Sequence, residues 1–462
     1  MSVSLVLPYR ELHKKYNVKG SYYTAYPPSG LWQEKYTGQD YLSALRSVLI
    51  ETADRPLQLY LHFPYCTAQC YYCQCFQLVS NNKEKLNQMV DALLTEINLL
   101  KIFFYQHGIA PHFREVHLGG GSPSCLDEEA FNRLIGGLND LVQIETLDEF
   151  AIEIDPRTVN KDKLKFYNTC GINRISFGIQ ELDTRVQKAI NRVQSMELVE
   201  ELLEMRSLFK GVNFDLLYGL PLQTRETLSA TLQRVSTLSP DRIAFSVLGY
   251  RPDVFKHNQM IHESDLPEFI ERTMMWEESQ KFFVANGYER IGMDHFAKPD
   301  DELAIAKHQK KLFRNSMGYS VGRFHDTLSV GPSGMTRLAH YYFQNTYSIQ
   351  EYVSSVKVGN FPVFRGYILN NDDLLRRHVM NELMTYYVLD MAEVGKDFGI
   401  RFKEYFKDEL QRLDVFVEEG IVELTEDRLQ VTALGNYFLR NICMVFDNLE
   451  LGYKHNIESG LK

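Results

Sequence analysis

The chain has 462 residues, of which 50 are Lys or Arg and 60 are Asp or Glu, so its formal charge at neutral pH is −10. Hydrophobic residues make up 44% and charged residues 24% of the chain, a normal composition for a globular protein of two or three domains. Nucleic-acid binding requires clustered cations, so the net negative charge and the lack of a long Lys/Arg run argue against a nucleic-acid partner.

The sequence carries no membrane or export signal. Residues 1–14 lack an apolar core with basic flanks and a cleavage site. No later segment reaches the ~18 uninterrupted apolar residues of a spanning helix. We therefore expect a cytoplasmic protein without a membrane span.

Short β-rich runs alternate with longer helical patterns between residues 57 and 250. They predict strands at 58–63, 115–118, 149–155, 173–179, 212–217 and 242–248. Apolar residues at helical spacing, with Asp, Ser or Thr near the start, predict helices over 85–105, 127–142, 196–209 and 225–238. This alternation predicts an α/β fold with a parallel sheet, and six strands are too few to close an eight-stranded barrel. We expect a partial (β/α)6 TIM-like barrel with its site at the carboxyl ends of the strands.

The flanking segments predict two further parts. Residues 1–52 form an N-terminal extension with an aromatic stretch at 20–28, which we expect to pack on the barrel and to close over a substrate. Residues 53–365 form the barrel domain and its extension, which includes a helix over 266–286. Residues 366–462 are predicted to be a mostly helical, winged-helix-like domain with a hairpin over 419–432 and a helix over 433–446. Acidic residues surround the hairpin and favour a docking or lid role over DNA binding.

Residues suited to binding and catalysis gather where the predicted strands end. The first strand leads into Cys66, the second into three glycines at 119–121, the third into Asp155 and the fifth into Gly219. Loops carry function on such scaffolds, although glycines alone also serve ordinary turns.

The cysteine cluster is the strongest local signal. Four of seven cysteines fall within ten residues, as Cys66-x3-Cys70-x2-Cys73 followed by Cys75. This crowding is unlike a disulfide framework and indicates soft thiolate ligands for zinc or for an iron–sulfur cluster. A four-cysteine zinc site is one alternative, although such sites usually draw their ligands from two separated pairs. Three cysteines on one loop can instead hold three corners of a [4Fe–4S] cube and leave the fourth iron open.

The cysteine loop, with Tyr72 just before its last cysteine, resembles the signature of radical S-adenosylmethionine enzymes. Further motifs narrow the resemblance to the oxygen-independent coproporphyrinogen III dehydrogenase (oxidase) family, from about Lys14 to Asp447. They are YLHFPYC at 60–66, CQC at 73–75, GGGSPS at 119–124, EIDPR at 153–157, FGIQ at 177–180, NR at 191–192, NFDLLYGLP at 213–221, GMDHFA at 292–297 and RNICM at 440–444.

This resemblance implies a set of cofactors and site residues. It implies a [4Fe–4S] cluster on Cys66, Cys70 and Cys73, with Cys75 unligated, and two molecules of S-adenosylmethionine. Positions matching those around S-adenosylmethionine are Tyr60, Tyr72, Gly120, Gly121, Ser122, Glu153, Gln180, Arg192, Asp215, Gly249 and Met335. By its own chemistry Arg192 can hold a carboxylate through a two-point fork, and Glu153 or Asp215 can accept hydrogen bonds from ribose hydroxyls. A buried Arg–Glu pair could equally be structural.

The implied reaction is the anaerobic oxidative decarboxylation of two propionates of coproporphyrinogen III to vinyl groups, giving protoporphyrinogen IX. The implied enzyme is a monomer that receives electrons from a donor such as flavodoxin or ferredoxin. Candidate cations for the substrate carboxylates are Arg192, Lys310, Lys311 and Arg314. The chain departs from the family at Tyr22, where an arginine is usual, so one cation is missing.

Two alternatives stay open. One is a radical S-adenosylmethionine paralogue that acts on another tetrapyrrole. The other is a haem carrier without turnover, which a close branch of the family provides. Cys75 favours the dehydrogenase, because the carrier branch generally lacks a cysteine at this position.

Overall fold

The computed structural model describes residues 3–18, 21, 23, 26–52, 55–321 and 326–449. Six parallel strands lie side by side in chain order, which confirms the predicted α/β partial barrel. They are β1 (Pro56–Phe63), β4 (His112–Gly120), β5 (Glu149–Ile154), β6 (Arg174–Gln180), β7 (Gly211–Tyr218) and β8 (Arg242–Val247).

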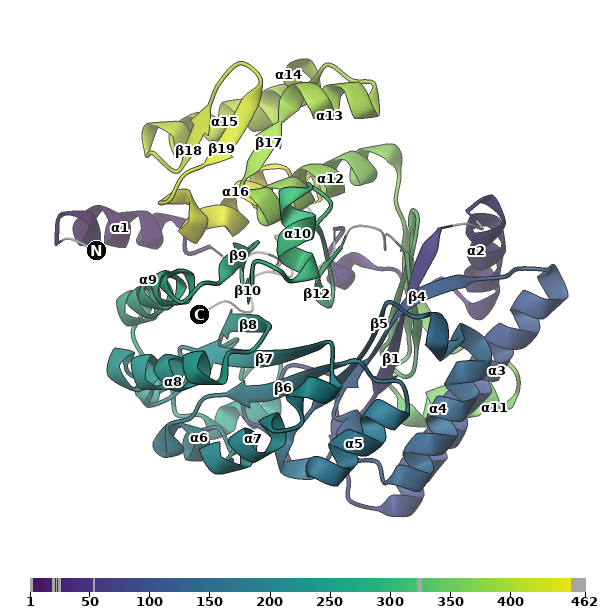
Figure 1. Cartoon of the computed structure of the whole chain (residues 1–462). Coiled ribbons are helices and arrows are strands. Elements are labelled where there is room, and N and C mark those ends of the chain that lie inside the picture. The colour runs from purple at the N-terminus through teal and green to yellow at the C-terminus, as the bar shows by residue number, and fades with distance from the viewer. Residues whose placement is uncertain are drawn as a thin grey trace.

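Helices cover the outer face of this sheet (Figure 1). They are α3 (Lys83–His107), α4 (Glu128–Val142), α5 (Lys161–Thr169), α6 (Thr184–Ala189), α7 (Met196–Leu203), α8 (Arg225–Leu238), α9 (Phe269–Ala285) and α11 (Ile349–Lys357). The predicted start signals act as N-caps. The side chains of Asp127, Ser195 and Thr224 each accept a hydrogen bond from the backbone amide three residues later.

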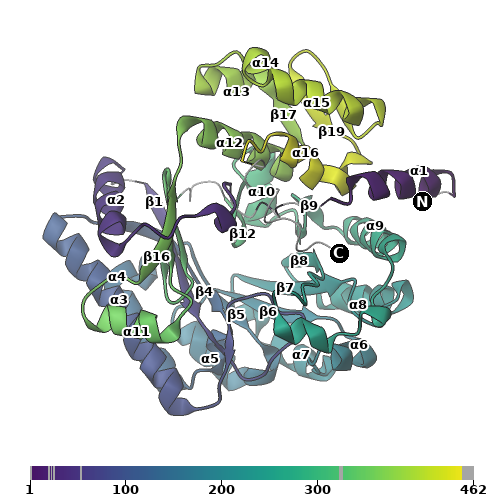
Figure 2. The same cartoon turned by 180° about the vertical axis from the view of Figure 1, so that it is seen from behind.

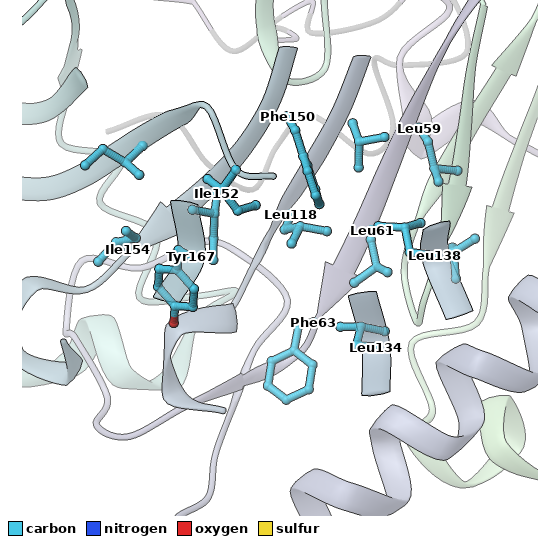
Figure 3. Close-up of a cluster of buried hydrophobic side chains, with 14 of the residues drawn as sticks. Leu59, Leu61, Phe63, Leu118, Leu134, Leu138, Phe150, Ile152, Ile154 and Tyr167 are labelled. Atoms are coloured by element: carbon cyan, nitrogen blue, oxygen red, sulfur yellow. The ribbon is translucent and has the colours of Figure 1, made fainter. Parts of the chain in front are cut away.

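Side chains of β1 point alternately to the helix-covered core and to the inside of the barrel. Leu59, Leu61 and Phe63 are buried and face the helices, where Leu134 and Leu138 of α4 meet them (Figure 3). Burying each such side chain contributes about 1.5–3 kcal/mol. The intervening residues of β1 face the concave side of the sheet, which we call the lumen, and their polar groups are available there.

The sheet extends beyond the six predicted strands. β13 (Asp326–Val330) adds a seventh parallel strand next to β1, and β14 (Met335–Leu338), β15 (Tyr341–Asn345) and β16 (Val363–Ile368) continue it antiparallel. At the other edge, β10 (His295–Ala297) and β9 (Glu289–Ile291) pair antiparallel to β8. These strands were not assigned from the sequence, because β13 pairs with residues 269 positions earlier and no local pattern encodes that partner.

The remaining short elements complete the barrel and its loops. β2 (Tyr65–Cys66) and β3 (Leu78–Val79) pair in parallel just after β1, and β11 (Phe313–Asn315) and β12 (Gly318–Ser320) form a hairpin after α10 (Glu302–His308). None of the helices in the described part of the chain is long and apolar enough to span a membrane.

The C-terminal part is mostly helical. It comprises α12 (Asn371–Tyr386), α13 (Met391–Phe398), α14 (Phe402–Tyr405), α15 (Lys407–Glu418), α16 (Leu439–Val445) and the sheet β17 (Val388–Asp390), β19 (Arg428–Val431), β18 (Val422–Leu424). The predicted hairpin is confirmed by the pairing of β18 with β19. The helix predicted from residue 433 begins only at Leu439, because residues 435–438 form a 3₁₀ turn.

The N-terminal extension contacts both parts of the molecule. α2 (Gly38–Glu51) buries Tyr41 and Leu45 in the barrel core, as expected. α1 (Val3–Tyr16) lies beside the C-terminal domain (Figures 1 and 2), where the ring of Tyr16 stacks on Phe416 at 4.9 Å. The expected packing on the barrel is therefore confirmed for α2, and α1 shares it, because the His13 ring also stacks on Phe269 of α9 at 3.1 Å between ring centroids.

Candidate active site

The cysteine loop begins directly after β1, at the carboxyl end of the strand. Backbone hydrogen bonds from Leu78 to Pro64 (2.7 Å) and from Ser80 to Cys66 (3.0 Å) close its base. The tip is held from a distant segment, since Asn258 Nδ2 donates to the Tyr71 carbonyl at 2.6 Å. The loop is therefore fixed before any cofactor binds.

Two arginines approach the thiol of Cys70. Arg192 Nη1 lies 3.5 Å and Arg157 Nη2 3.8 Å from the Cys70 Sγ atom, and Asp155 pairs with both guanidinium groups. Burial raises the pKa of Cys66, and the nearby thiols of Cys73 and Cys70 raise it further. Three close thiols with adjacent cations fit an anionic metal–thiolate centre.

The described residues contain no set of three His, Cys, Asp or Glu side chains placed to hold a single metal ion. A [4Fe–4S] cube takes each thiolate on a different iron atom, so its cysteines stand further apart than the ligands of one ion. The placement of the three cysteines on one loop therefore fits the cluster. Cys75 is exposed at the end of the same loop.

The glycines after β4 bring the backbone close to the lumen. Gly120 has a φ of +106°, and a Cβ atom there would lie 2.6 Å from the His62 ring. A Cβ atom on Gly121 would lie 2.6 Å from the Tyr65 carbonyl oxygen. Only glycine fits at these two positions, and both amides are used within the protein, the Gly120 amide by Glu153 at 3.2 Å and the Gly121 amide by the Phe63 carbonyl at 2.7 Å.

Three predicted residues, Tyr60, Glu153 and Asp215, face the lumen between β1 and β7. Glu153 accepts hydrogen bonds from His117 Nε2 (2.9 Å) and from the Gly120 amide (3.2 Å). Burial opposes ionisation of Glu153, but the hydrogen bond and charge of His117 outweigh it, so its pKa lies below the usual value. Burial and the charge of Glu153 raise the pKa of Asp215 to about 6. The Tyr60 ring stacks on His117 at 5.8 Å. The two lumen carboxyls thus differ in acidity.

Other predicted residues reach the same edge. Gln180 sits at a bulge of β6 with a φ of +66°, beside Arg192, whose Nη2 donates to the Gly178 carbonyl at 2.6 Å. The Gly249 carbonyl accepts a hydrogen bond from Gln74 of the cysteine loop at 2.6 Å. Tyr72 packs near Ile190. The structure thus brings these residues together around the cysteines.

Two predicted residues differ from this pattern. The Ser122 hydroxyl is engaged with Ser124 at 2.7 Å and faces the Asp155 amide, so it serves the protein's own turn. Met335 lies on β14, four strands from β5, and lines a pocket toward the C-terminal domain.

The candidate cations separate into three groups. Lys310 and Lys311 are exposed, Arg192 lies at Cys70, and Arg314 is buried and pairs with Asp294. Tyr22 lies outside the described residues. Sequence reasoning missed Arg157 and His117. Both could have been identified by their position, since Arg157 follows the strand predicted at 149–155 and His117 lies near the end of the strand predicted at 115–118.

Comparisons with known proteins identify the class of protein to which the chain belongs. Residues 60–235 match the model of the radical SAM superfamily, and residues 369–438 match the HemN C-terminal domain. The match begins on β1 and includes the whole cysteine loop, so the barrel and its site define a radical S-adenosylmethionine protein.

Full-length relatives give the family. The chain is 36% identical to the oxygen-independent coproporphyrinogen III oxidase of Escherichia coli K12, over 94% of each chain. It is 33% identical to the enzyme of that name from Helicobacter pylori 26695, over 96% of this chain and 98% of that one. The solved structure of coproporphyrinogen III oxidase from Escherichia coli superposes with a TM-score of 0.86, covering 92% of this chain and 97% of that one. The chain belongs to the oxygen-independent coproporphyrinogen III oxidase family.

Proposed function

We propose that the protein catalyses the oxygen-independent oxidative decarboxylation of two propionates of coproporphyrinogen III, giving protoporphyrinogen IX. The observation that carries the proposal is the fixed cysteine loop at the carboxyl end of β1, within a chain that matches coproporphyrinogen oxidases over its whole length. The acidic lumen and the cationic groups around Cys70 agree with this function.

In this proposal Cys66, Cys70 and Cys73 hold a [4Fe–4S] cluster. When bound, the cluster and S-adenosylmethionine supply one-electron reduction and hydrogen abstraction at carbon. Arg157 and Arg192 balance the negative charge at Cys70. The Gly120 and Gly121 backbone lets an amino acid moiety come close, and Arg192 or Gln180 can hold its carboxylate.

The lumen carboxyls then serve binding more than proton transfer. Glu153 is ionised at neutral pH and can accept hydrogen bonds from ribose hydroxyls, as can Asp215. Tyr60, Tyr72, Ser122, Gly249 and Met335 complete the proposed surroundings of two S-adenosylmethionine molecules. No general base of shifted pKa is required, because the reaction needs exclusion of water and positioning.

The proposal extends to the setting of the enzyme. We infer a cytoplasmic monomer that receives electrons from a small carrier such as flavodoxin or ferredoxin, without a nucleic-acid partner. The net charge of −10 supports the last point. Three parts are proposed to divide the chain at residues 1–52, 53–365 and 366–462.

The test is an anaerobic turnover experiment. The reconstituted protein receives coproporphyrinogen III, S-adenosylmethionine and a reductant, and tetrapyrroles are followed by mass spectrometry. Appearance of protoporphyrinogen IX is expected, with none in a Cys70→Ser control. Cleavage of S-adenosylmethionine with an unchanged tetrapyrrole would replace the proposal by a paralogue with another substrate. A tight haem complex without turnover would indicate the carrier function.

A further inference from the structure

A pocket lies where the N-terminal segment, the sheet extension and the C-terminal domain meet. Its lining combines aromatic and sulfur-containing side chains with three arginines, and its cavity of about 50 Å³ has the size and chemistry for a carboxylate side chain rather than for a whole ring. We call it the arginine pocket, and its lining includes Tyr26, Trp32, Arg314, Met335, Arg337 and Arg377.

The register of the sheet shows which way this pocket faces. Arg337 of β14 stands opposite Thr327 of β13, and the Thr327 hydroxyl donates to Gln58 Oε1 of β1 at 3.1 Å. Residues opposite each other share a face, so Arg337 lies on the lumen side. Met335 lies two residues earlier and shares this face. The arginine pocket therefore lies on the lumen face of the sheet, level with Gln58 near the amino end of β1, and it includes Met335, one of the proposed S-adenosylmethionine residues.

The charges in the pocket are unbalanced. Arg314 pairs with Asp294, at 3.3 Å between Nη1 and Oδ1. Arg377 donates only to the carbonyl oxygen of Ala339 and the hydroxyl of Tyr342, both neutral acceptors. Across the described residues, no carboxylate lies within ion-pair distance of Arg337 or Arg377.

Among the described residues, Arg337 has no ion-pair partner. Its guanidinium stacks over the Phe313 ring at 4.2 Å, and its buried Nε has no hydrogen-bond acceptor in that part of the protein. Burial and the charge of Arg377 lower the pKa of Arg337 to about 10, against the opposing effects of Tyr342 and Asp326. A buried cation that is left unpaired costs folding free energy, so a folding role does not account for it.

We infer that Arg337, supported by Arg377, binds a propionate carboxylate of the tetrapyrrole substrate, and that Met335 contacts the apolar part of the same side chain. The inference rests on the proposed function for the identity of the substrate. A guanidinium fork matches a carboxylate in two parallel hydrogen bonds, and the pocket holds this fork in low-dielectric surroundings. Arg337 is thereby a residue that determines specificity for a carboxylated ring.

The test measures binding separately from turnover. The probes are coproporphyrin III, which has four free carboxylates, and its tetramethyl ester, which has none; binding to the cluster-loaded full chain is followed by fluorescence quenching. R337M is expected to weaken coproporphyrin III binding by about tenfold or more. R337K should weaken it less, and binding of the ester should stay the same in all variants. The matched control R234M removes Arg234, a surface residue of α8 that pairs with Glu200 of α7, and this variant should bind like the wild type.

A further readout separates a binding role from a structural one. R337M should not lower the melting temperature, because it removes a buried charge that has no ion-pair partner among the described residues. Unchanged coproporphyrin III binding, or an equal loss for the ester, would overturn the inference. A third outcome is that coproporphyrin III binding depends on Arg337 while the wild type forms no protoporphyrinogen. This would support the carboxylate subsite and reject the proposed reaction.

Discussion

At the scale of single residues, the proposed cluster ligand Cys70 and the unligated Cys75 differ in burial. Cys70 is buried against two guanidinium groups, whereas Cys75 is exposed. Substituting serine at Cys66, Cys70 or Cys73 should abolish [4Fe–4S] binding, and Cys75→Ser should retain it. Iron and acid-labile sulfide per chain provide the measurement. Full cluster content in Cys70→Ser would reject this ligand set, and loss in Cys75→Ser would bring the four-cysteine site back.

A second prediction at this scale concerns Gly120. Alanine would place its Cβ atom 2.6 Å from the His62 ring at a φ of +106°, so Gly120→Ala should destabilise the fold by about 1–3 kcal/mol and weaken S-adenosylmethionine binding. Gly136→Ala is the matched control, since Gly136 lies in α4 with open space around its Cβ position. It should stabilise the protein by roughly 0.5–1 kcal/mol. Equal melting temperatures for both variants would contradict the steric argument.

At the scale of elements, a buried carboxyl joins α3 to the turn after β13. Glu96 accepts hydrogen bonds from the Gly331 amide (2.8 Å), the Tyr352 hydroxyl (2.5 Å) and Asn345 Nδ2 (2.8 Å). A Cβ atom on Gly331 would lie 2.3 Å from the His62 carbonyl oxygen, so the turn adjoins the lumen. Glu96 therefore holds one wall of the site in register with β1.

This network predicts a pH dependence of stability. Burial raises the pKa of Glu96 from 4.5 to about 7, so the folded state binds more protons than the unfolded state between these values. Its stability contribution is thus largest below about pH 4.5 and falls as the pH rises to 7, by about 3 kcal/mol in all. Glu96→Gln should flatten the slope of unfolding free energy against pH in this range. An unchanged slope in urea titrations would show that Glu96 ionises normally.

The six barrel strands and their main helices could be predicted because each carries its own periodicity and capping residues, as Asp127 and Thr224 illustrate. The edge strands could not be predicted, since β13 pairs with β1, far away in the sequence, and β14 joins the sheet only through β13. The same limit applies to the site. Cys66, Cys70 and Cys73 lie on one loop, so their spacing alone predicts a site. Arg337 is a charged residue in a short strand, and its place on the lumen face follows only from the pairing of the sheet.

At the scale of the whole molecule, the two ends of the chain meet beside the arginine pocket. The Tyr23 hydroxyl donates to Asp447 Oδ2 at 2.8 Å, and Trp32 stacks on Tyr342 of the sheet at 4.9 Å. The N-terminal segment is therefore bound to the C-terminal domain and to the sheet at once. This agrees with the prediction that residues 1–52 close over a substrate, which stays a prediction.

The contact between the chain ends should make the stability of the molecule depend on Tyr23. Asp447 is buried, and burial raises its pKa, while the Tyr23 hydroxyl stabilises its charged form. Tyr23→Phe removes this donor and should cost about 1–3 kcal/mol near neutral pH. Because the variant raises the pKa of Asp447 further, the loss should grow as the pH rises through the folded-state pKa of Asp447, which lies above the ordinary value of 3.8, and shrink below it.

Tyr288→Phe is the matched comparison, since its buried hydroxyl donates to a neutral acceptor, the Pro240 carbonyl, at 2.7 Å. Its loss should be of similar size and should not change with pH. Chemical unfolding of both variants between pH 4 and pH 8 provides the measurement, and hydrogen exchange of residues 26–36 reports whether the N-terminal segment loosens with Tyr23→Phe. A pH-independent loss in both variants would mean that Asp447 is not ionised at the junction, and that the two ends are joined by packing alone.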